Sequence, residues 1–410
     1  MATENKKYIP ALRFPEFQND GEWNYEYGNM LYDSIVNKKH KSDLPILAIT
    51  QDNGAIPRDE INYRVIVNDK SIEGYKIVEI GDFIISLRSF QGGIEYSRYK
   101  GLCSPAYIVL RKKHSKICDD FYRHYFKSFQ YIQALNRNLE GIRDGKMVSY
   151  KQFSDIKLPC PSLAEQKKIA DCLSSLDKYI DATKRKLELL KDHKKGLMQR
   201  LFPAKGKTTP ELRFPEFQND GEWQIVSLGE ITSVVNRRNK SNRSLSIYSI
   251  NNAEGFVPQS QQFAGMDSEA RGYDISAYKI IGKHTFAYNP ARINVGSIGY
   301  SGELKDILIS SLYVCFKAVE NVDDDFLMCF FNSYIFNQAV ESNVEGGIRS
   351  YLFYENFSRI NIAIPSLYEQ KRIASCVTSI EDMIKKSNEQ ISLLETHKKG
   401  LLQQLFPMIK

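Results

Sequence analysis

The chain has 410 residues, of which 42% are hydrophobic and 12% aromatic, and it carries a formal net charge of +7. This length suggests two or three domains, and this composition is typical of a globular protein with real hydrophobic cores. No apolar run is long enough to cross a bilayer or to act as a signal sequence, so we expect a cytoplasmic protein without a membrane partner. The mildly basic charge permits a polyanionic partner but does not require one.

One stretch of twelve residues occurs twice. Residues 12–23 read LRFPEFQNDGEW, and residues 212–223 repeat the same letters 200 positions further on. Two further stretches recur at a spacing of 204 residues: PSLAEQKKIADCL (161–173) with PSLYEQKRIASCV (365–377), and HKKGLMQRLFP (193–203) with HKKGLLQQLFP (397–407). Because the repeat runs nearly from end to end, the chain consists of two tandem copies of one unit.

Between these shared ends each copy has a middle in which the likeness is weaker but keeps its order. VNKKHKS at 36–42 corresponds to VNRRNKS at 235–241, and GIR at 141–143 corresponds to GIR at 347–349. Short β-rich runs are present in both middles: PILAIT, YKIVEIGDFIISL and AYIVLR in the first, and LSIYSI, YKIIGKHTFAY and SSLYVCFKA in the second. A helical apolar face follows each set, so we expect two compact α+β domains.

A long helix is predicted to follow each middle. Ser162 and Glu165, like Ser366 and Glu369, have the spacing of a capping box, in which the serine bonds a backbone N–H and the glutamate reaches back. Apolar residues then recur every three or four positions to form a heptad seam: Ile169, Leu173, Leu176, Ile180, Thr183, Leu187, Leu190, Lys194, Leu197 and Leu201, and in the second copy Ile373, Val377, Ile380, Ile384, Ser387, Ile391, Leu394, Lys398, Leu401 and Leu405. Each helix is expected to be a rod of about 60 Å that ends at Leu-Phe-Pro.

The two lysines in these seams favour an antiparallel pair of helices. A parallel, in-register pair would set Lys194 beside Lys398 in an apolar seam, which is unfavourable for like charges. An antiparallel pair would instead place Lys194 near Ile380 and Thr183 near Ile391. Packing of each helix on its own domain is the alternative. The predicted domains are therefore 1–160 and 204–364, each α+β, separated by coiled-coil helices at 161–203 and 365–410.

The order of these motifs resembles a known family. L-R-F-P-E-F and a tryptophan, a variable domain, G-I-R, F-x-x-I, then P-S-L-x-E-Q-K-x-I-A and a long helix, all present twice, are similar to the DNA-specificity (S) subunit of type I restriction-modification systems. The resemblance spans essentially the whole chain. It implies two target-recognition domains that each read one half of a split, asymmetric site in double-stranded DNA, with paired helices that fix the unread spacer.

The resemblance also implies partners. The scaffold would dock two methylation (M) subunits, and restriction (R) subunits would complete an ATP-dependent nuclease. Adenine-N6 methylation and cleavage would belong to those subunits, together with S-adenosylmethionine, ATP and Mg²⁺, so this chain itself would be no enzyme and hold no cofactor. A bacterial or archaeal, nucleoid-associated location follows.

Matching basic segments are candidates for binding phosphates, because each follows a short apolar run as clamping loops often do. They are Lys38, Lys39, His40 and Lys41 in the first copy, and Arg237, Arg238, Asn239, Lys240 and Arg243 in the second. A solvated basic turn is the alternative for both.

Arg88 and Arg292 align at a spacing of 204 residues, each in a glycine-containing turn between β-like runs. There a backbone can approach a groove, and an arginine can bond guanine through two hydrogen bonds. Gln91 and Asn294 nearby are candidate adenine readers, although an ordinary hairpin turn is the alternative. Arg143, Lys146 and Arg349 near the helix junctions are candidate phosphate ligands, with a salt bridge to the helix cap as the alternative.

Catalytic motifs are not recognisable in the sequence. Asn289-Pro290-Ala291-Arg292 lacks the second proline and the aromatic residue of an amino-methyltransferase motif, and no G-x-x-x-x-G-K-[ST] loop is present. The seven cysteines form no C-x-x-C pair, which favours a reduced compartment without a structural metal. The leading interpretation is a non-catalytic DNA-recognition subunit; the alternative is a coiled-coil assembly scaffold whose variable domains bind proteins.

Overall fold

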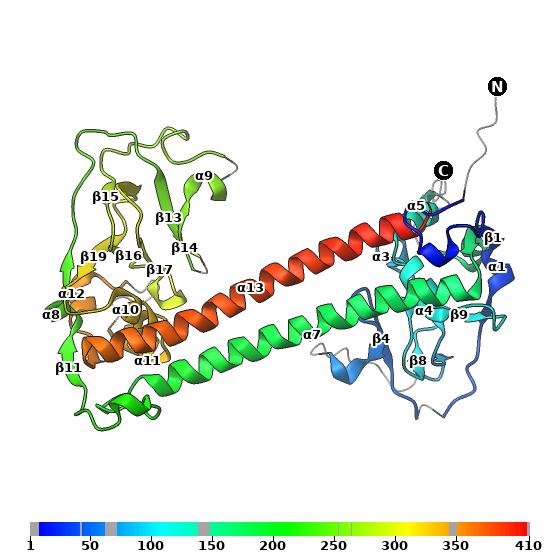
Figure 1. The fold of residues 1–410 in the computed structure, drawn as a ribbon, viewed down its shortest axis with the longest axis horizontal. Coiled ribbons are helices and arrows are strands. Elements are labelled where there is room, and N and C mark those ends of the chain that lie inside the picture. The colour runs from blue at the N-terminus through cyan, green and yellow to red at the C-terminus, as the bar shows by residue number, and fades with distance from the viewer. Residues whose placement is uncertain are drawn as a thin grey trace. The chain divides into compact units, whose positions relative to one another are not determined.

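The computed structural model describes residues 8–41, 43–61, 72–137, 148–252, 254–263, 265–343 and 351–407. The chain divides into two compact units (Figure 1). The first unit comprises residues 1–184 and 389–410, and the second comprises residues 185–388. Each unit therefore contains the start of one long helix and the end of the other.

Among its described residues, the first unit contains one four-stranded antiparallel sheet and three short strand pairs. The sheet has the order β2 (Tyr32–Ile35), β9 (Ile108–Lys112), β6 (Phe83–Ile85) and β7 (Glu95–Tyr96). The pairs are β3 (Leu47–Thr50) with β4 (Gly54–Pro57), β5 (Lys76–Val78) with β8 (Gly101–Cys103), and β1 (Asn24–Tyr27) with β10 (Lys157–Cys160).

Helices α4 (Asp119–Tyr125) and α5 (Phe129–Arg137) supply the aromatic face predicted for this unit. Short helical turns precede the first strand or connect later ones: η1 (Pro15–Phe17), α1 (Gly28–Leu31), η2 (Arg58–Glu60), α3 (Ser89–Gly92) and α6 (Tyr150–Ser154). Tyr32 is fully buried and meets Phe83 and Tyr122 edge to face at ring-centroid distances of 5.6 Å. These rings explain the high aromatic content, because such pairs fill a core with large apolar surfaces.

The second unit repeats this plan, but four of its strands form a second four-stranded sheet where the first unit has two separate strand pairs. One sheet has the order β12 (Thr232–Val234), β19 (Val314–Ala318), β16 (Phe286–Tyr288) and β17 (Ile298–Tyr300). The other has the order β14 (Gly255–Pro258), β13 (Ile247–Asn251), β18 (Ile307–Ile309) and β15 (Lys279–Ile281), and β11 (Gln224–Ser227) pairs with β20 (Asn361–Ile364). Its helices are α8 (Leu228–Ile231), α9 (Gln259–Gln262), α10 (Asp324–Phe331), α11 (Tyr334–Asn343) and α12 (Tyr354–Ser358), with turns η3 (Pro215–Phe217) and η4 (Ile293–Val295). The prediction of two tandem α+β domains is confirmed.

Strand pairing corrects the alignment of the basic segments by one residue. The Ile77 amide donates to the Asn37 carbonyl, and the Ile280 amide donates to the Arg237 carbonyl, both at 2.7 Å. Ile77 and Ile280 occupy the same place in the aligned letters YKI. Asn37 therefore corresponds to Arg237, at a spacing of 200, and the match of VNKKHKS with VNRRNKS is shifted by one residue from the structural register.

In each copy, an arginine of the repeated twelve-residue segment binds a glutamate in the first turn of the long helix. The Arg13 guanidinium donates to both carboxylate oxygens of Glu165 at 2.7 and 2.8 Å, and Arg213 does the same to Glu369 at 2.9 and 2.8 Å. The capping boxes are thus only half as predicted: Glu165 and Glu369 donate their backbone N–H to Ser162 and Ser366, but their carboxylates are taken by the arginines. A guanidinium fork binds a carboxylate more strongly than a single backbone N–H does.

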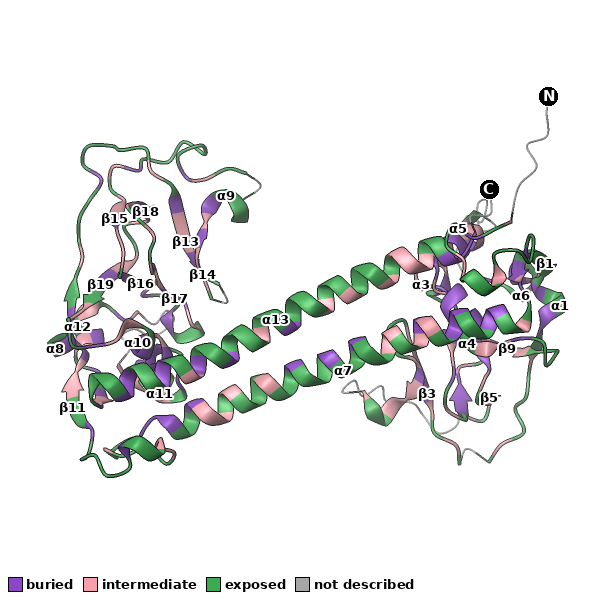
Figure 2. Cartoon of the chain, in the orientation of Figure 1, coloured by how far each residue is buried: buried purple, intermediate pink, exposed green. Residues whose placement is uncertain are grey.

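The two long helices are present as α7 (Leu163–Leu201) and α13 (Leu367–Leu405), each of 39 residues. All the predicted seam positions are buried or half-buried, and charged residues between them are largely exposed. Figure 2 shows this as buried and half-buried bands that recur along both helices. The spacing of three and four residues explains the bands, since it keeps one side of a helix facing its neighbour.

Ion pairs give the direction of the helices within each unit. In the first unit, Asp177 of α7 pairs with Lys398 of α13 at 2.6 Å, and Lys184 pairs with Glu395 at 2.6 Å. The residue numbers rise along α7 and fall along α13, so the helices are antiparallel there. In the second unit Lys194 reaches Glu381 at 2.6 Å, next to the predicted neighbour Ile380. Each seam lysine therefore forms an ion pair with a carboxylate of the other helix and does not lie against the other lysine.

Candidate nucleic-acid interface

The connection between β6 and β7 carries the candidate readers of the first unit. Arg88 immediately precedes the single turn α3, and both Arg88 and Gln91 are exposed. Gly93 ends the turn at a φ of 81°, in the left-handed region that favours glycine. The turn presents two polar side chains to solvent from a backbone held between two paired strands.

The connection between β16 and β17 carries the candidate readers of the second unit in the same place. Arg292 and Asn294 are exposed, and Arg292 precedes the single turn η4. Gly296 follows this turn at a φ of 85°. We call residues 88–93 and 292–296 the first and second loop. Both loops join the same two strands of equivalent sheets, as the aligned letters predicted.

Each loop is also held by an amide side chain that sequence reasoning did not identify. Gln51, in the turn between β3 and β4, donates its Nε2 hydrogen to the Arg88 carbonyl at 3.3 Å. Asn252, in the turn between β13 and β14, donates its Nδ2 hydrogen to the Val295 carbonyl at 2.7 Å. Each residue directly follows the first strand of its hairpin and lies three positions before a glycine with positive φ, Gly54 and Gly255. In the sequence, their common position before the hairpin glycine is the signal by which these two residues could have been identified.

The basic segment of the first unit runs beside β5. The His40 ring Nε2 lies 3.1 Å from the Tyr75 carbonyl oxygen, and this contact together with the Asn37 bond fixes the segment to the strand edge. Lys38, Lys39 and Lys41 are exposed, whereas His40 is half-buried. These three lysines are thus accessible to solvent, while the imidazole contributes to local structure.

The basic segment of the second unit contains an acidic residue that the sequence did not suggest. Arg237 and Arg243 both approach Asp306, at 3.5 and 3.2 Å. Arg238 and Lys240 are exposed. A phosphate bound by the two paired arginines would therefore have to compete with the Asp306 carboxylate.

Asn239 is a correction to the candidate set. Its side chain is completely buried, its Nδ2 group donates to the Arg243 carbonyl at 3.0 Å, and its Oδ1 atom accepts from the Arg243 amide at 2.9 Å. An asparagine can close a turn in this way by imitating backbone groups. Asn239 therefore shapes the basic segment and does not present its amide at the surface. Arg143, Lys146 and Arg349 lie outside the described residues.

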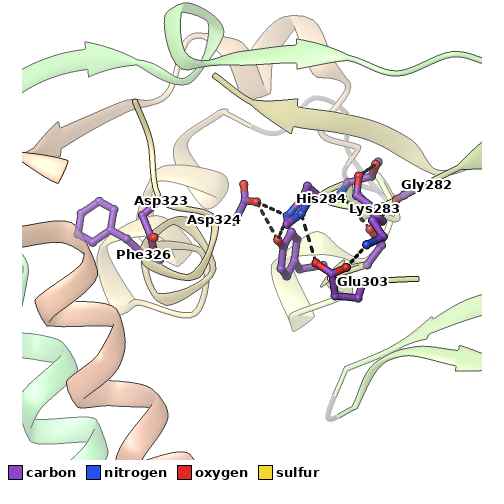
Figure 3. A network of polar contacts seen from close by, with 10 residues as sticks. Gly282, Lys283, His284, Glu303, Asp323, Asp324 and Phe326 are labelled. Carbon is purple, nitrogen blue, oxygen red and sulfur yellow. Dashed lines mark hydrogen bonds and ion pairs between the residues drawn. The ribbon is translucent and has the colours of Figure 1, made fainter. Parts of the chain in front are cut away.

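A polar network lies at the other end of the β16–β17 hairpin from the second loop. Figure 3 shows His284 between Asp324 and Glu303. The His284 Nδ1 atom lies 2.6 Å from the Tyr300 hydroxyl and 3.2 Å from Asp324, and the Tyr300 hydroxyl donates to Asp324 at 2.7 Å. Because Asp324 begins α10, these contacts tie the base of the hairpin to that helix.

Within the described residues, no group of three or more histidine, cysteine, aspartate or glutamate side chains could hold a metal ion. All seven cysteines are free thiols. In the same part of the chain no helix has the length and apolarity needed to cross a bilayer.

The chain is thus a two-domain protein in which tandem α+β domains carry equivalent exposed polar loops and are each attached to a long helix. The family model described as "Type I restriction modification DNA specificity domain" matches residues 16–192 and 220–395. These matches cover most of the chain, so the chain belongs to this family and is a specificity subunit of the type I restriction-modification kind.

Individual relatives agree with this assignment. The type I restriction enzyme MjaVIII specificity subunit of Methanocaldococcus jannaschii is 26% identical over 353 residues, which cover 80% of this chain and 79% of that protein. The crystal structure of a type I restriction-modification system S subunit from M. genitalium has a TM-score of 0.56 at 13% identity and covers 98% of this chain and all of that one. A chain from a study of complex assembly and conformational transition of the type I R-M system has a TM-score of 0.54 at 15% identity, covering 94% of this chain and 97% of that chain. At such identities the two structures support the fold alone.

Proposed function

We propose that this specificity subunit binds double-stranded DNA without catalysing a reaction, and that each unit reads one half of a bipartite, asymmetric site. One observation carries the proposal. The first and second loops each expose an arginine and an amide residue from the same connection of the same sheet. Arginine can bond guanine and an amide can bond adenine through paired hydrogen bonds in the major groove. Different readers on equivalent loops would read different half-sites.

The remaining basic residues would bind the DNA backbone. Lys38, Lys39 and Lys41 are exposed beside β5, and Arg238 and Lys240 are exposed at the equivalent edge of the second unit. Such lysines and arginines neutralise phosphates without reading sequence. Arg143, Lys146 and Arg349 stay in the proposed set as phosphate ligands.

The long helices would set the spacer between the half-sites and wind as an antiparallel coiled coil. Their 39 residues each form one uninterrupted helix, and their seam positions are shielded from solvent. A continuous helix resists bending, so the distance between whatever its ends hold would be nearly fixed.

The repeated scaffold would dock two alike methylation subunits. Arg13, Trp23 and Glu165 line a groove of 1260 Å³ in the first unit, and Arg213, Trp223 and Glu369 line a groove of 360 Å³ in the second. Leu189 and Leu393, 204 residues apart, are each 70% exposed on the long helices. Features that recur at equivalent positions suit two copies of one partner. The methylation subunits would supply adenine-N6 transfer with S-adenosylmethionine, and restriction subunits would supply ATP- and Mg²⁺-dependent cleavage.

Loop substitutions in the complex with methylation subunits test the proposal. A random-sequence DNA library would be methylated, and the base preference at each position read by sequencing. Arg88→Ala should weaken discrimination at one position of one half-site by about 10- to 100-fold, and Arg292→Ala should do so in the other half-site. Lys191→Ala, an exposed substitution on α7, is the control and should change neither.

Salt dependence separates DNA binding from the scaffold alternative. Replacing Lys38 and Lys39 with alanine should weaken binding to all sequences alike and lower the slope of log K against log salt by about one for each phosphate that is no longer neutralised. An assembled complex that binds DNA weakly, without a salt slope and without sequence preference, would instead favour variable domains that bind proteins.

A further inference from the structure

Lys127 forms an unusual set of contacts behind the first loop. It lies between α4 and α5, and its ammonium group donates to Glu95 Oε1 at 2.5 Å and to the carbonyl oxygens of Gly92 and Gln51 at 3.0 Å each. A lysine ammonium has three hydrogens, and these contacts use all of them. One side chain thus joins α3, the β3–β4 turn and strand β7.

The ion pair of Lys127 and Glu95 is largely buried, where a charged group loses the stabilisation that water provides. The side chain of Glu95 is 2% exposed and that of Lys127 is 29% exposed, and the second carboxylate oxygen of Glu95 is buried without a hydrogen-bond partner among the described residues. Burial raises the pKa of the Glu95 carboxyl to about 7, although Lys127 acts against this shift. A buried ion pair of this kind is seldom a net source of stability, since desolvation offsets the attraction. The contribution of this ion pair is therefore expected in the groups that it holds in place rather than in the stability of the fold.

What it positions is the backbone of the first loop. Gly92 belongs to α3, and Gln51 holds the Arg88 carbonyl at the other end of the same turn. Behind the loop, a Cβ atom at Gly93 would come within 1.9 Å of the Phe126 carbonyl oxygen, the residue before Lys127. The loop is therefore seated directly on the α4–α5 connection, and Lys127 fixes it there through hydrogen bonds.

The second unit lacks this device. The letters Phe-Lys-Ser at 126–128 become Phe-Asn-Ser at 331–333, and Ile-Glu-Tyr-Ser at 94–97 become Ile-Gly-Tyr-Ser at 298–301. Both partners of the ion pair are thus replaced, by Asn332 and Gly299. Asn332 is exposed, and the second loop is held from its hairpin turn by Asn252. The two loops are equivalent in position but differ in how they are held.

We propose that Lys127, neutralised by Glu95, is a positioning residue for the first loop, so that recognition of one half-site alone depends on this buried pair. The inference rests on the proposed function, because it takes the first loop to be a DNA reader. Lys127 touches no base in this account; it acts through Gly92 and through Gln51.

The test is the double variant Glu95→Gln with Lys127→Met in the full chain, assembled with methylation subunits and assayed on a random-sequence DNA library. Replacing both partners by neutral groups of similar shape avoids leaving one buried charge unpaired, so the fold should persist. Loss of the two loop hydrogen bonds should lower base discrimination in one half-site by about tenfold. The other half-site should stay as in the wild type, and the melting temperature should not fall below that of the wild type.

Asn332→Met is the matched control, because it changes the equivalent position in the unit that lacks the pair; it should alter neither half-site. Asn252→Ala should loosen only the half-site that the double variant leaves intact. Unchanged discrimination in the double variant, or an equal loss in both half-sites, would overturn the inference. Absence of any sequence motif with the wild-type complex would instead overturn the proposed function, and the inference with it.

Discussion

Arg13 and Arg213 each form a guanidinium fork with a glutamate that is almost inaccessible to solvent. The side chains of Glu165 and Glu369 are 1% exposed. Removing one partner of a buried ion pair leaves an uncompensated charge, which costs about 3–5 kcal/mol. We therefore expect Arg13→Ala to destabilise the first unit and Arg213→Ala the second, with lysine only a partial substitute because it lacks the planar fork.

Tryptophan fluorescence can resolve the two units. The chain has only two tryptophans, Trp23 and Trp223, one in each unit and each 3% exposed. With Trp223→Phe as background, Trp23 fluorescence reports urea unfolding of the first unit. In this background Arg13→Ala should lower the free energy of unfolding by about 3–5 kcal/mol. A loss below about 1 kcal/mol, the range of exposed pairs, would show that the fork does not hold the helix start.

Two buried groups of the first unit give opposite pH dependences. Glu95 has a pKa raised to about 7 from 4.5, so the folded state keeps a proton that the unfolded chain loses, and stability falls as pH rises through this window. Burial, with Arg123 and Lys398, lowers the pKa of His124 from 6.5 to about 2, so stability falls as pH drops below 6.5. Between pH 5 and pH 7 each effect amounts to about 2 kcal/mol, and they nearly cancel.

Glu95→Gln should remove the pH dependence of stability that comes from Glu95 and leave the opposite one that comes from His124. Relative to the wild type, the variant should gain about 2 kcal/mol of stability on going from pH 5 to pH 7, measured by urea unfolding with Trp23 as the probe. Lys100, which pairs with Glu79 on the surface, supplies the control Lys100→Met, and this should leave the pH profile unchanged. Parallel profiles for Glu95→Gln and the wild type would mean that Glu95 keeps an ordinary pKa.

The sequence predicted the place of single residues in the fold, though not their role, where both copies share a pattern. Arg88 and Arg292 lie on equivalent loops because the glycines and flanking strands around them align. Asn239 was misassigned, since an asparagine that closes a turn and one that faces a ligand have the same local letters. Lys127 and Glu95 were not identified because their 32-residue separation has no period, and only the fold brings them together.

At the scale of elements, the long helices were the most predictable part of the chain. A seam at spacings of three and four residues fixes which side is buried. The two seam lysines indicated the antiparallel direction because a parallel, in-register pair would set two like charges side by side. Their carboxylate partners, Glu381 and Asp177, were not predicted. The capping boxes were half right, because the competing donors Arg13 and Arg213 lie about 150 residues away in the sequence.

Lengthening both helices tests their proposed role as a ruler. Insertion of seven helix-forming residues between 184 and 185 and between 388 and 389 preserves the heptad register in both. The added rise of about 10 Å corresponds to about three base pairs of DNA, so the preferred spacer should lengthen by that number while both half-sites persist. Insertion in α7 alone is the control and should disturb assembly, because it breaks the pairing of the seams. An unchanged spacer in the doubly lengthened chain would contradict the proposal that the long helices set the spacer length.

At the scale of the whole molecule, the duplication repeats the shared ends of the sequence around two different α+β middles, which we propose to be two independent recognition domains. Exchanging residues 24–160 for the corresponding segment of another specificity subunit should replace one half-site and leave the other and the spacer length unchanged. The reciprocal exchange of residues 224–364 should replace the other half-site. Methylation of a random-sequence library by each chimaera gives the result, and a change in both half-sites after a single exchange would contradict independent reading.

The most direct measurement is long-read detection of N6-methyladenine across the genome of a host that carries this chain with a methylation subunit, compared with a host that lacks only this chain. We expect one new bipartite, asymmetric motif whose two halves are separated by a spacer of constant length. Absence of any new motif, despite an expressed and assembled complex, would contradict the central claim that this chain reads DNA.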